Sequence, residues 1–128
     1  MRTIVRNSLD VKDEIDRLWH ERQLHVDMMR ERFPAARILA AVARAHGCTV
    51  EEMRTLSRDR RLSIARHHAV WEMRRRRLDL SFQNIAAELN RTNHATAIHS
   101  WQTFCELVRR GQYEVERKAV LAALGDKL

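Results

Sequence analysis

Apolar residues recur every three or four positions along most of the chain, which is the period of an amphipathic helix. The first such stretch ends at Pro34, and a proline disfavours helical geometry in the residue before it. We therefore expect a helix that begins at Ser8 or Asp10, either of which can cap it, and runs to about Phe33. Its apolar residues fall mostly on one face: Val11, Ile15, Leu18, Trp19, Val26, Met29 and Phe33.

This first helix has two alternative roles. It either packs on its own domain or pairs with a second copy of the chain, and we favour self-association or an extended arm. Arg22 and His25 interrupt the apolar face, which argues against a strict coiled coil. The chain is thus expected to divide at Pro34 into an N-terminal amphipathic helix (residues 1–33), with a homodimer forming through residues 8–33, and a helical domain (residues 34–128).

The domain after Pro34 is predicted to consist of short helices. Thr49 and Glu52 have the spacing of a capping box at the start of a short helix, and Gly47 is suited to end the helix before it. Residues 57–62 are rich in arginine and lack a helix-length apolar stripe, so we interpret them as a basic loop. Other helices are expected at about Ala35–Ala45, Ser63–Arg77 and Tyr113–Leu124.

Residues 81–104 predict two helices joined by a tight turn. Both helices carry apolar residues at helical spacing, and the segment between them holds residues that disfavour a helix interior. In the order helix, turn, helix, these are Ile85, Ala86 and Leu89; Asn90, Arg91 and Thr92; and Ala97, Ile98, Trp101 and Phe104. Such a pair is a helix-turn-helix, which presents its second helix to the major groove of DNA. An ordinary helical hairpin is the alternative for this stretch alone.

Composition supports an all-α fold and a polyanionic partner. Glycine (3) and proline (1) are scarce and 45% of the residues are hydrophobic, as in a packed helical protein. Lys and Arg number 24 against 17 Asp and Glu, which gives a formal net charge of +7. Arginine greatly outnumbers lysine, and its guanidinium fork pairs bidentately with phosphate.

The motifs of common enzyme classes are missing from this sequence. It contains neither a glycine-rich phosphate loop nor a nucleophile elbow. His94 and His99 lie about 140° apart around a helix, so they cannot easily share a metal. We predict a protein without catalytic activity, nucleotide, metal or other cofactor.

The start of the sequence lacks a secretory signal and no stretch approaches the ~18 apolar residues of a membrane span, so we expect no membrane association and a cytoplasmic, nucleoid-associated location.

The basic segments before residue 81 suggest how DNA would be held. Arginines of a basic loop beside a helix-turn-helix can lie along the backbone or in the minor groove, and arginines at a helix end can bind phosphates. The loop group is Arg58, Arg60, Arg61 and Arg66, and the phosphate group is Arg75, Arg76, Ser81 and Arg91. Asn93, His94 and Thr96 would face the major groove. A solvated charged face is the alternative for the run Arg74–Arg77.

The stretch from about Ile38 to Phe104 resembles the C-terminal DNA-binding domain of the bacterial replication initiator DnaA. AVARAHGCTVEEM is similar to that family's first two helices, and SRDRRLSIAR resembles its basic loop running into "VAR". LDLSFQNIAAEL is similar to "TDLSLPEIG", and NRTNHATAIHS resembles the signature "GGRDHTTVLHA". His94, Thr96 and His99 keep both identity and spacing. The resemblance implies a Trp-repressor-like helix-turn-helix bundle, here without the ATPase module, to which the long first helix is added.

The resemblance also assigns roles to individual residues. The family's minor-groove arginine falls on Arg60, and a phosphate-contacting residue falls on or near Arg75. The proline that touches a base falls on Gln83. The group that reads the DnaA box falls on Asn93, His94, Ala95 and Thr96.

The departures from the family signature include three positions at the start of the second helix of the pair. The signature's Arg-Asp pair has become Thr92-Asn93, and its first threonine has become Ala95. Aspartate accepts a hydrogen bond from cytosine N4, whereas asparagine pairs best with adenine, so we predict an altered DNA site. We expect sequence-specific binding of double-stranded DNA by a transcriptional regulator of a bacterium or phage. A replication-control protein that competes at origin sites and a protein-interaction adaptor are the alternatives.

Overall fold

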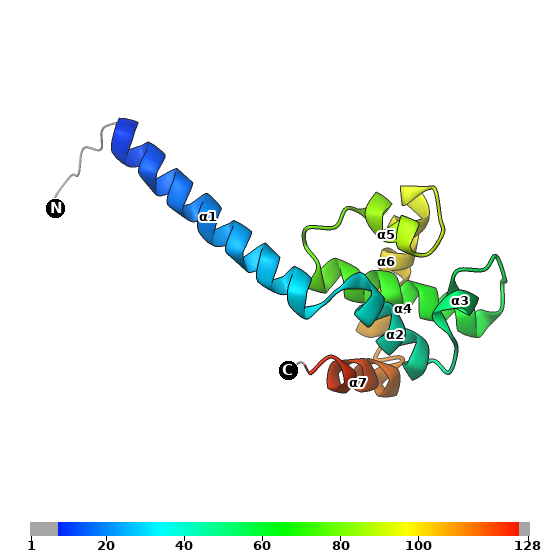
Figure 1. The fold of residues 1–128 in the computed structure, drawn as a ribbon. Coiled ribbons are helices and arrows are strands. Elements are labelled where there is room, and N and C mark those ends of the chain that lie inside the picture. Colours follow the sequence, from blue (N-terminus) through cyan, green and yellow to red (C-terminus); the bar gives the residue numbers. More distant parts are fainter. Residues whose placement is uncertain (1–7, 126–128) are drawn as a thin grey trace.

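The computed structural model describes residues 8–125, and residues 1–7 of the expected N-terminal segment lie outside them. Within the described range the structure holds helices and no strand, which confirms the all-α class (Figure 1). The helices are α1 (Ser8–Arg32), α2 (Ala35–Ala45), α3 (Val50–Met53), α4 (Arg60–Arg76), α5 (Phe82–Glu88), α6 (His94–Arg109) and α7 (Glu114–Ala123).

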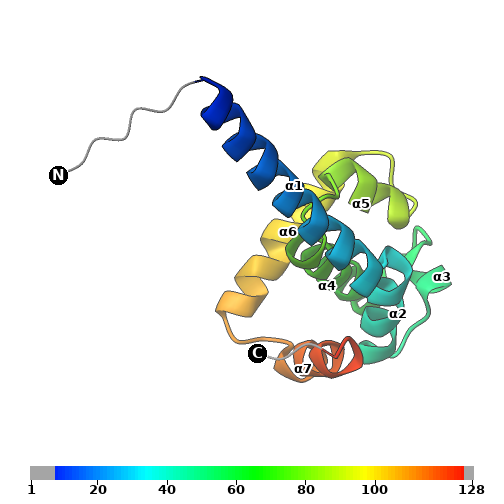
Figure 2. The same cartoon turned by 60° about the vertical axis from the view of Figure 1, so that its left-hand side comes forward.

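Helix α1 projects from the body formed by the other helices, as both ribbon views show (Figures 1 and 2). Its base is anchored where Phe33 is 1% exposed and the Arg76 guanidinium lies 5.0 Å from the ring centroid. Arg77 also donates a hydrogen bond of 3.2 Å to the Phe33 carbonyl. The apolar side chains nearer the free end stay 41–66% exposed: Val11, Ile15, Leu18 and Trp19.

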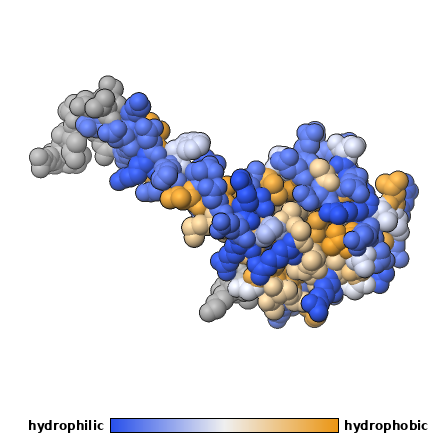
Figure 3. All heavy atoms as spheres, in the orientation of Figure 1, coloured by the Kyte–Doolittle hydropathy of each residue, from blue (hydrophilic) through white to orange (hydrophobic). Residues whose placement is uncertain are grey.

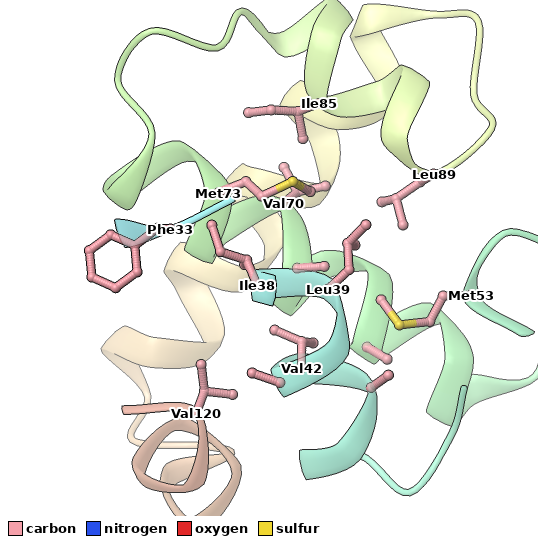
Figure 4. Packing of buried hydrophobic residues seen from close by; sticks show 14 of the residues in the cluster. Phe33, Ile38, Leu39, Val42, Met53, Val70, Met73, Ile85, Leu89 and Val120 are labelled. Carbon is pink, nitrogen blue, oxygen red and sulfur yellow. The ribbon is translucent and has the colours of Figure 1, made fainter. Parts of the chain in front are cut away.

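Helix α4 is the centre of the domain, because α2, α3, α5 and α6 all pack against it. Figure 4 shows apolar side chains from α2, α3, α4, α5 and α7, and from residues that directly follow α1 and α5, converging on one interior. The labelled side chains are Phe33, Ile38, Leu39, Val42, Met53, Val70, Met73, Ile85, Leu89 and Val120. Burial of this cluster is the main force that holds the short helices together.

Caps define where the short helices begin. Thr49 and Glu52 form the expected capping box, with side-chain bonds of 3.1 and 3.0 Å. Gly47 takes a φ of +68° after α2, a left-handed geometry that favours glycine.

The extent of the predicted basic loop was wrong. Helix α4 begins at Arg60, not near Ser63, because the Asp59 carboxylate caps it by accepting a hydrogen bond of 2.8 Å from the Arg61 amide. Leu62 then turns inward and is buried in the first turn. The loop between α3 and α4 therefore covers residues 54–59, and Arg60 and Arg61 belong to the helix.

Histidines connect α2, α4 and α6. His68 is fully buried, stacks on Phe104 at 4.5 Å, and has its Nδ1 2.8 Å from His46 Nε2. His67 Nδ1 lies 2.9 Å from the Ser100 hydroxyl of α6. Burial, reinforced by the neighbouring His68, lowers the pKa of His46 to about 4. Burial, reinforced by His99, likewise lowers the pKa of His67 to about 4, so both rings are neutral when folded.

Replacing Phe104 by Ala should destabilise the domain. The ring is fully buried between His68 and Trp71, so its removal leaves a cavity and should cost about 3–5 kcal/mol. Val115→Ala, at a side chain 77% exposed, should change stability by less than ~0.5 kcal/mol. Urea unfolding followed by circular dichroism measures both values, and a loss below 1 kcal/mol for Phe104→Ala would contradict this packing.

Stability should fall as the pH drops from about 6.5 to about 4. In that interval the unfolded chain protonates His46 and His67, whereas the folded protein keeps them neutral. The loss should be about 2 kcal/mol in total, below the full shifts because both rings keep some contact with water. Urea unfolding at pH 7.5, 6 and 5 tests this. His67→Gln should reduce the dependence of the unfolding free energy on pH, and His20→Gln on exposed α1 should not. Equal pH dependence in the unchanged protein and both variants would contradict this prediction.

Candidate nucleic-acid interface

Helices α5 and α6 form the helix-turn-helix that the sequence predicted. Ser81 caps α5 in a capping box with Asn84. Asn90 takes a φ of +56° in the turn, and the Arg91 amide donates a hydrogen bond of 2.8 Å to the Ala86 carbonyl. Asn93 then caps α6 by accepting a hydrogen bond of 2.9 Å from the Ala95 amide. Local hydrogen bonds thus set the position of α6 relative to α5.

The first turn of α6 exposes a continuous row of residues. Thr92, Asn93, His94, Ala95 and Thr96 are all exposed, and the next residue, Ala97, is buried against the domain. The start of α5 adjoins this row, because a shallow hollow is lined by residues of both helices. The lining residues are Ser81, Phe82, Gln83 and His94. The structure therefore brings together all six residues that were expected to face the major groove.

Capping changes what Asn93 can offer. Its side-chain oxygen already accepts the Ala95 amide hydrogen, so the carboxamide is held in one orientation. The two amide hydrogens and one remaining lone pair on the oxygen are left for an outside group. An adenine contact at this position must accordingly fit the orientation that the cap imposes.

The basic segment beside the turn exposes three arginines. Arg58 lies in the α3–α4 loop, and Arg60 and Arg61 in the first turn of α4. Arg61 also donates a hydrogen bond of 3.1 Å to the Gly47 carbonyl. Figure 1 shows this loop on the same side of the domain as the α5–α6 turn. The loop is joined to the turn by the hydrogen bond from Arg91 to the Thr55 carbonyl, and Arg60 and Arg61 line a hollow with His46 and Tyr113.

Arg66 does not belong to this exposed group, contrary to the expectation from the sequence. It is 8% exposed, and its guanidinium donates to the carbonyls of Met53, Thr55 and Ser57 at 2.7, 2.9 and 2.7 Å. Burial, followed by the charge of Arg91, lowers the pKa of Arg66. Arg66 supports the α3–α4 loop from inside and is not placed to contact DNA.

The arginine run at the end of α4 is mostly structural, so neither a phosphate-binding cluster nor a solvated face describes it. Arg76 is buried, with its Nε 2.6 Å from a Glu72 carboxylate oxygen, which corrects its expected phosphate role. Arg77 is buried and pairs with Asp79, and Arg74 lies over the Phe82 ring at 4.6 Å. Arg75 is the exposed member of the run, with its guanidinium 4.5 Å from the Trp71 ring centroid.

Two further residues expected at phosphates have side chains engaged within the protein. The Ser81 hydroxyl bonds Asn84 in the capping box. Arg91 donates to the Leu89 carbonyl at 3.1 Å and to the Thr55 carbonyl at 2.8 Å. Arg54 was not singled out from the sequence. It extends from the end of α3 and donates a hydrogen bond of 2.9 Å to the Glu88 carbonyl at the end of α5. No local pattern could have revealed these bonds, because their partners lie 34 and 36 residues apart.

The part of the chain that the structure describes holds neither a candidate metal cluster nor a candidate membrane span. Within it, no three His, Cys, Asp or Glu side chains are grouped closely enough to hold a metal ion. None of the described helices combines the length and the apolar character that crossing a membrane requires.

Comparison with known proteins agrees with the geometry of α2 to α6. Residues 35–103, more than half of the chain, match the family described as bacterial dnaA protein helix-turn-helix. Neither the curated proteins nor the solved structures contain a match. The matched range begins at the first residue of α2 and ends within α6, so it includes the turn, the exposed row and the α3–α4 loop. The chain belongs to the DnaA helix-turn-helix family of DNA-binding domains.

Proposed function

We propose that this protein binds double-stranded DNA sequence-specifically through two adjoining elements. The start of α6 enters the major groove, where His94, Asn93 and Thr96 meet base edges. Arg58 and Arg60 lie in the adjacent minor groove or along the backbone, and Arg75 binds a phosphate. The observation that supports this most is the exposed row at the start of α6, in a helix-turn-helix whose turn is hydrogen-bonded to the loop that carries the exposed Arg58.

We propose transcriptional regulation in a bacterium or phage as the biological role. The departures at Thr92, Asn93 and Ala95 fall on the exposed row that we propose to meet base edges. A protein that competed for the standard sites of the family would need the same base contacts, so these departures favour a different site and different targets. Competition at replication origins is the alternative that a preference for the standard box would support.

The two groove contacts should respond differently to substitution. Arg60→Ala should weaken binding to all duplexes and reduce the slope of log K against log salt by about 0.9, because one phosphate-neutralising charge is lost. His94→Ala should leave that slope unchanged and cut the preference for the selected site by about 1–3 kcal/mol. Fluorescence anisotropy over a salt series, with selected and scrambled duplexes, measures both effects.

The same titration separates DNA binding from a protein-interaction adaptor. Affinity of the unchanged protein for duplex DNA should fall steeply as salt rises. Weak binding without salt dependence would support the adaptor, and equal loss of selectivity from Arg60→Ala and His94→Ala would contradict the division between the two elements.

We further propose that α1 pairs with α1 of a second copy. Val11, Ile15, Leu18 and Trp19 fall within about 100° of arc around the helix, and Figure 3 shows hydrophobic patches along the projecting arm. Between Ser8 and Arg32 seven acidic residues outnumber five Lys and Arg, although the whole chain carries +7. An acidic arm is repelled by phosphates, whereas the same helix in a second copy offers an equal apolar stripe and charges of both signs.

Pairing through α1 should depend on the side of the helix that is altered. Ile15→Lys with Leu18→Lys should convert a dimer into a monomer, because charges would be buried in the apolar stripe. Leu24→Lys is the matched control, since Leu24 is also exposed and lies about 180° from Ile15 around the helix. Light scattering gives the mass directly. A monomer for the unchanged chain, or a dimer that survives both changes, would rule out this pairing.

A further inference from the structure

Two arginines connect the α3–α4 loop to the helix-turn-helix in opposite directions. Arg54 extends from the end of α3 and donates to the Glu88 carbonyl at the end of α5, at 2.9 Å. Arg91 extends from the turn and donates to the Thr55 carbonyl in the loop, at 2.8 Å. We call Arg54, Thr55, Glu88 and Arg91 the clasp.

Each arginine of the clasp is held at more than one point. The Arg91 side chain also donates to the Leu89 carbonyl at 3.1 Å. Arg54 has a second nitrogen 3.9 Å from the Glu88 carboxylate. The planar guanidinium fork fixes direction as well as distance, which a lysine ammonium would not. The clasp therefore restrains both the separation and the relative orientation of the two segments.

The clasp adjoins the buried support of the loop. The Thr55 carbonyl accepts hydrogen bonds from both Arg91 and Arg66, at 2.8 and 2.9 Å. Two guanidinium groups thus converge on one oxygen, and the repulsion between them contributes to the lowered pKa of Arg66. The repulsion would be smaller if the Arg91 side chain turned toward solvent. In the structure Arg91 instead stays hydrogen-bonded to Thr55 and so connects the turn to the loop.

We propose that the clasp holds the α3–α4 loop and the start of α6 at one fixed separation, so that the protein accepts only DNA whose minor-groove and major-groove contacts match it. Arg54 and Arg91 act as positioning residues, and Arg58, Arg60 and His94 act as the DNA contacts. The inference rests on the proposed function and adds to it the way in which the two grooves are read together. Preorganisation of this kind avoids the cost of ordering a loop on binding.

The proposal distinguishes the clasp from a pair of phosphate contacts. A phosphate-binding arginine contributes about 0.9 to the slope of log K against log salt, so two would contribute about 1.8. A positioning arginine contributes nothing to that slope, because its charge stays on a protein carbonyl. Its loss instead lets the loop move relative to α6 and so relaxes the required spacing in the DNA.

The experiment compares Arg54→Ala/Arg91→Ala with the unchanged protein and with Arg109→Ala/Arg110→Ala. The second variant is the matched control, because it also removes two arginines but at the far end of α6, roughly 22–24 Å from His94. The probe is the best duplex from a random-sequence selection with the unchanged protein, in which footprinting has located the minor-groove and major-groove contacts. A second duplex carries one extra base pair between them, which moves the contacts apart by about 3.4 Å.

The unchanged protein and the control should lose on the order of 30-fold in affinity for the lengthened duplex, as expected when one groove contact is lost. The clasp variant should lose less than about 5-fold, and should bind the parent duplex about 10-fold more weakly with the salt slope of the control. Arg54→Lys/Arg91→Lys keeps the charges and one donor group on each side chain. Its loss of affinity for the lengthened duplex should lie between those of the control and of the alanine variant. If the alanine variant does not fold, as judged by circular dichroism, the lysine variant supplies the comparison.

Two results would overturn the proposal alone. One is a loss of affinity for the lengthened duplex that is as large in the clasp variant as in the control. The other is a salt slope lower by about 1.8, which would make Arg54 and Arg91 phosphate contacts. If the unchanged protein shows no salt-dependent binding to any duplex, the proposed function itself fails and the role of the clasp fails with it.

Discussion

The central constraint on this fold is that α4 carries many arginines and yet is covered by four other helices. A buried guanidinium without a partner would cost several kcal/mol, so each one on the covered faces must be paired. Arg66 is satisfied by three carbonyls, Arg76 by the Glu72 carboxylate, and Arg77 by Asp79 and the Phe33 carbonyl. These pairings fix the α3–α4 loop, the end of α4 and the base of α1. Part of the positive charge that the sequence alone would suggest for DNA binding is therefore paired inside the protein.

On α4 and the loop before it, four arginines stay exposed after these pairings. Arg58 lies in the loop, Arg60 and Arg61 lie in the first turn of α4, and Arg75 lies at its other end, while the exposed residues 92–96 follow the α5–α6 turn. In the proposed mode of binding, the same helix supplies internal support on its buried faces and DNA contacts on its exposed face. This division would let a small domain hold two DNA-contacting elements in a defined arrangement.

The sequence predicted the local features well and the long-range ones poorly. Helix α2, the Thr49 capping box and the helix-turn-helix follow from apolar period, capping residues and turn residues, which act over a few positions. The start of α4 was misplaced because Asp59 was not recognised as a cap. The buried states of Arg66 and Arg76 depend on which helices cover α4, and the bonds of Arg54 and Arg91 on contacts across 34 and 36 residues, so no local pattern reveals them.

Titration of the isotopically labelled protein with its selected duplex, followed by amide chemical shifts, would identify the residues that meet DNA. The largest shifts are expected in residues 54–61 and 92–96, with a smaller group near Arg75 and little change in α1 or α7. Both predicted groups should move together along the titration, because the loop and α6 bind as one unit. Large shifts in α1 or α7 with residues 92–96 unchanged would show that the protein does not bind DNA through its helix-turn-helix.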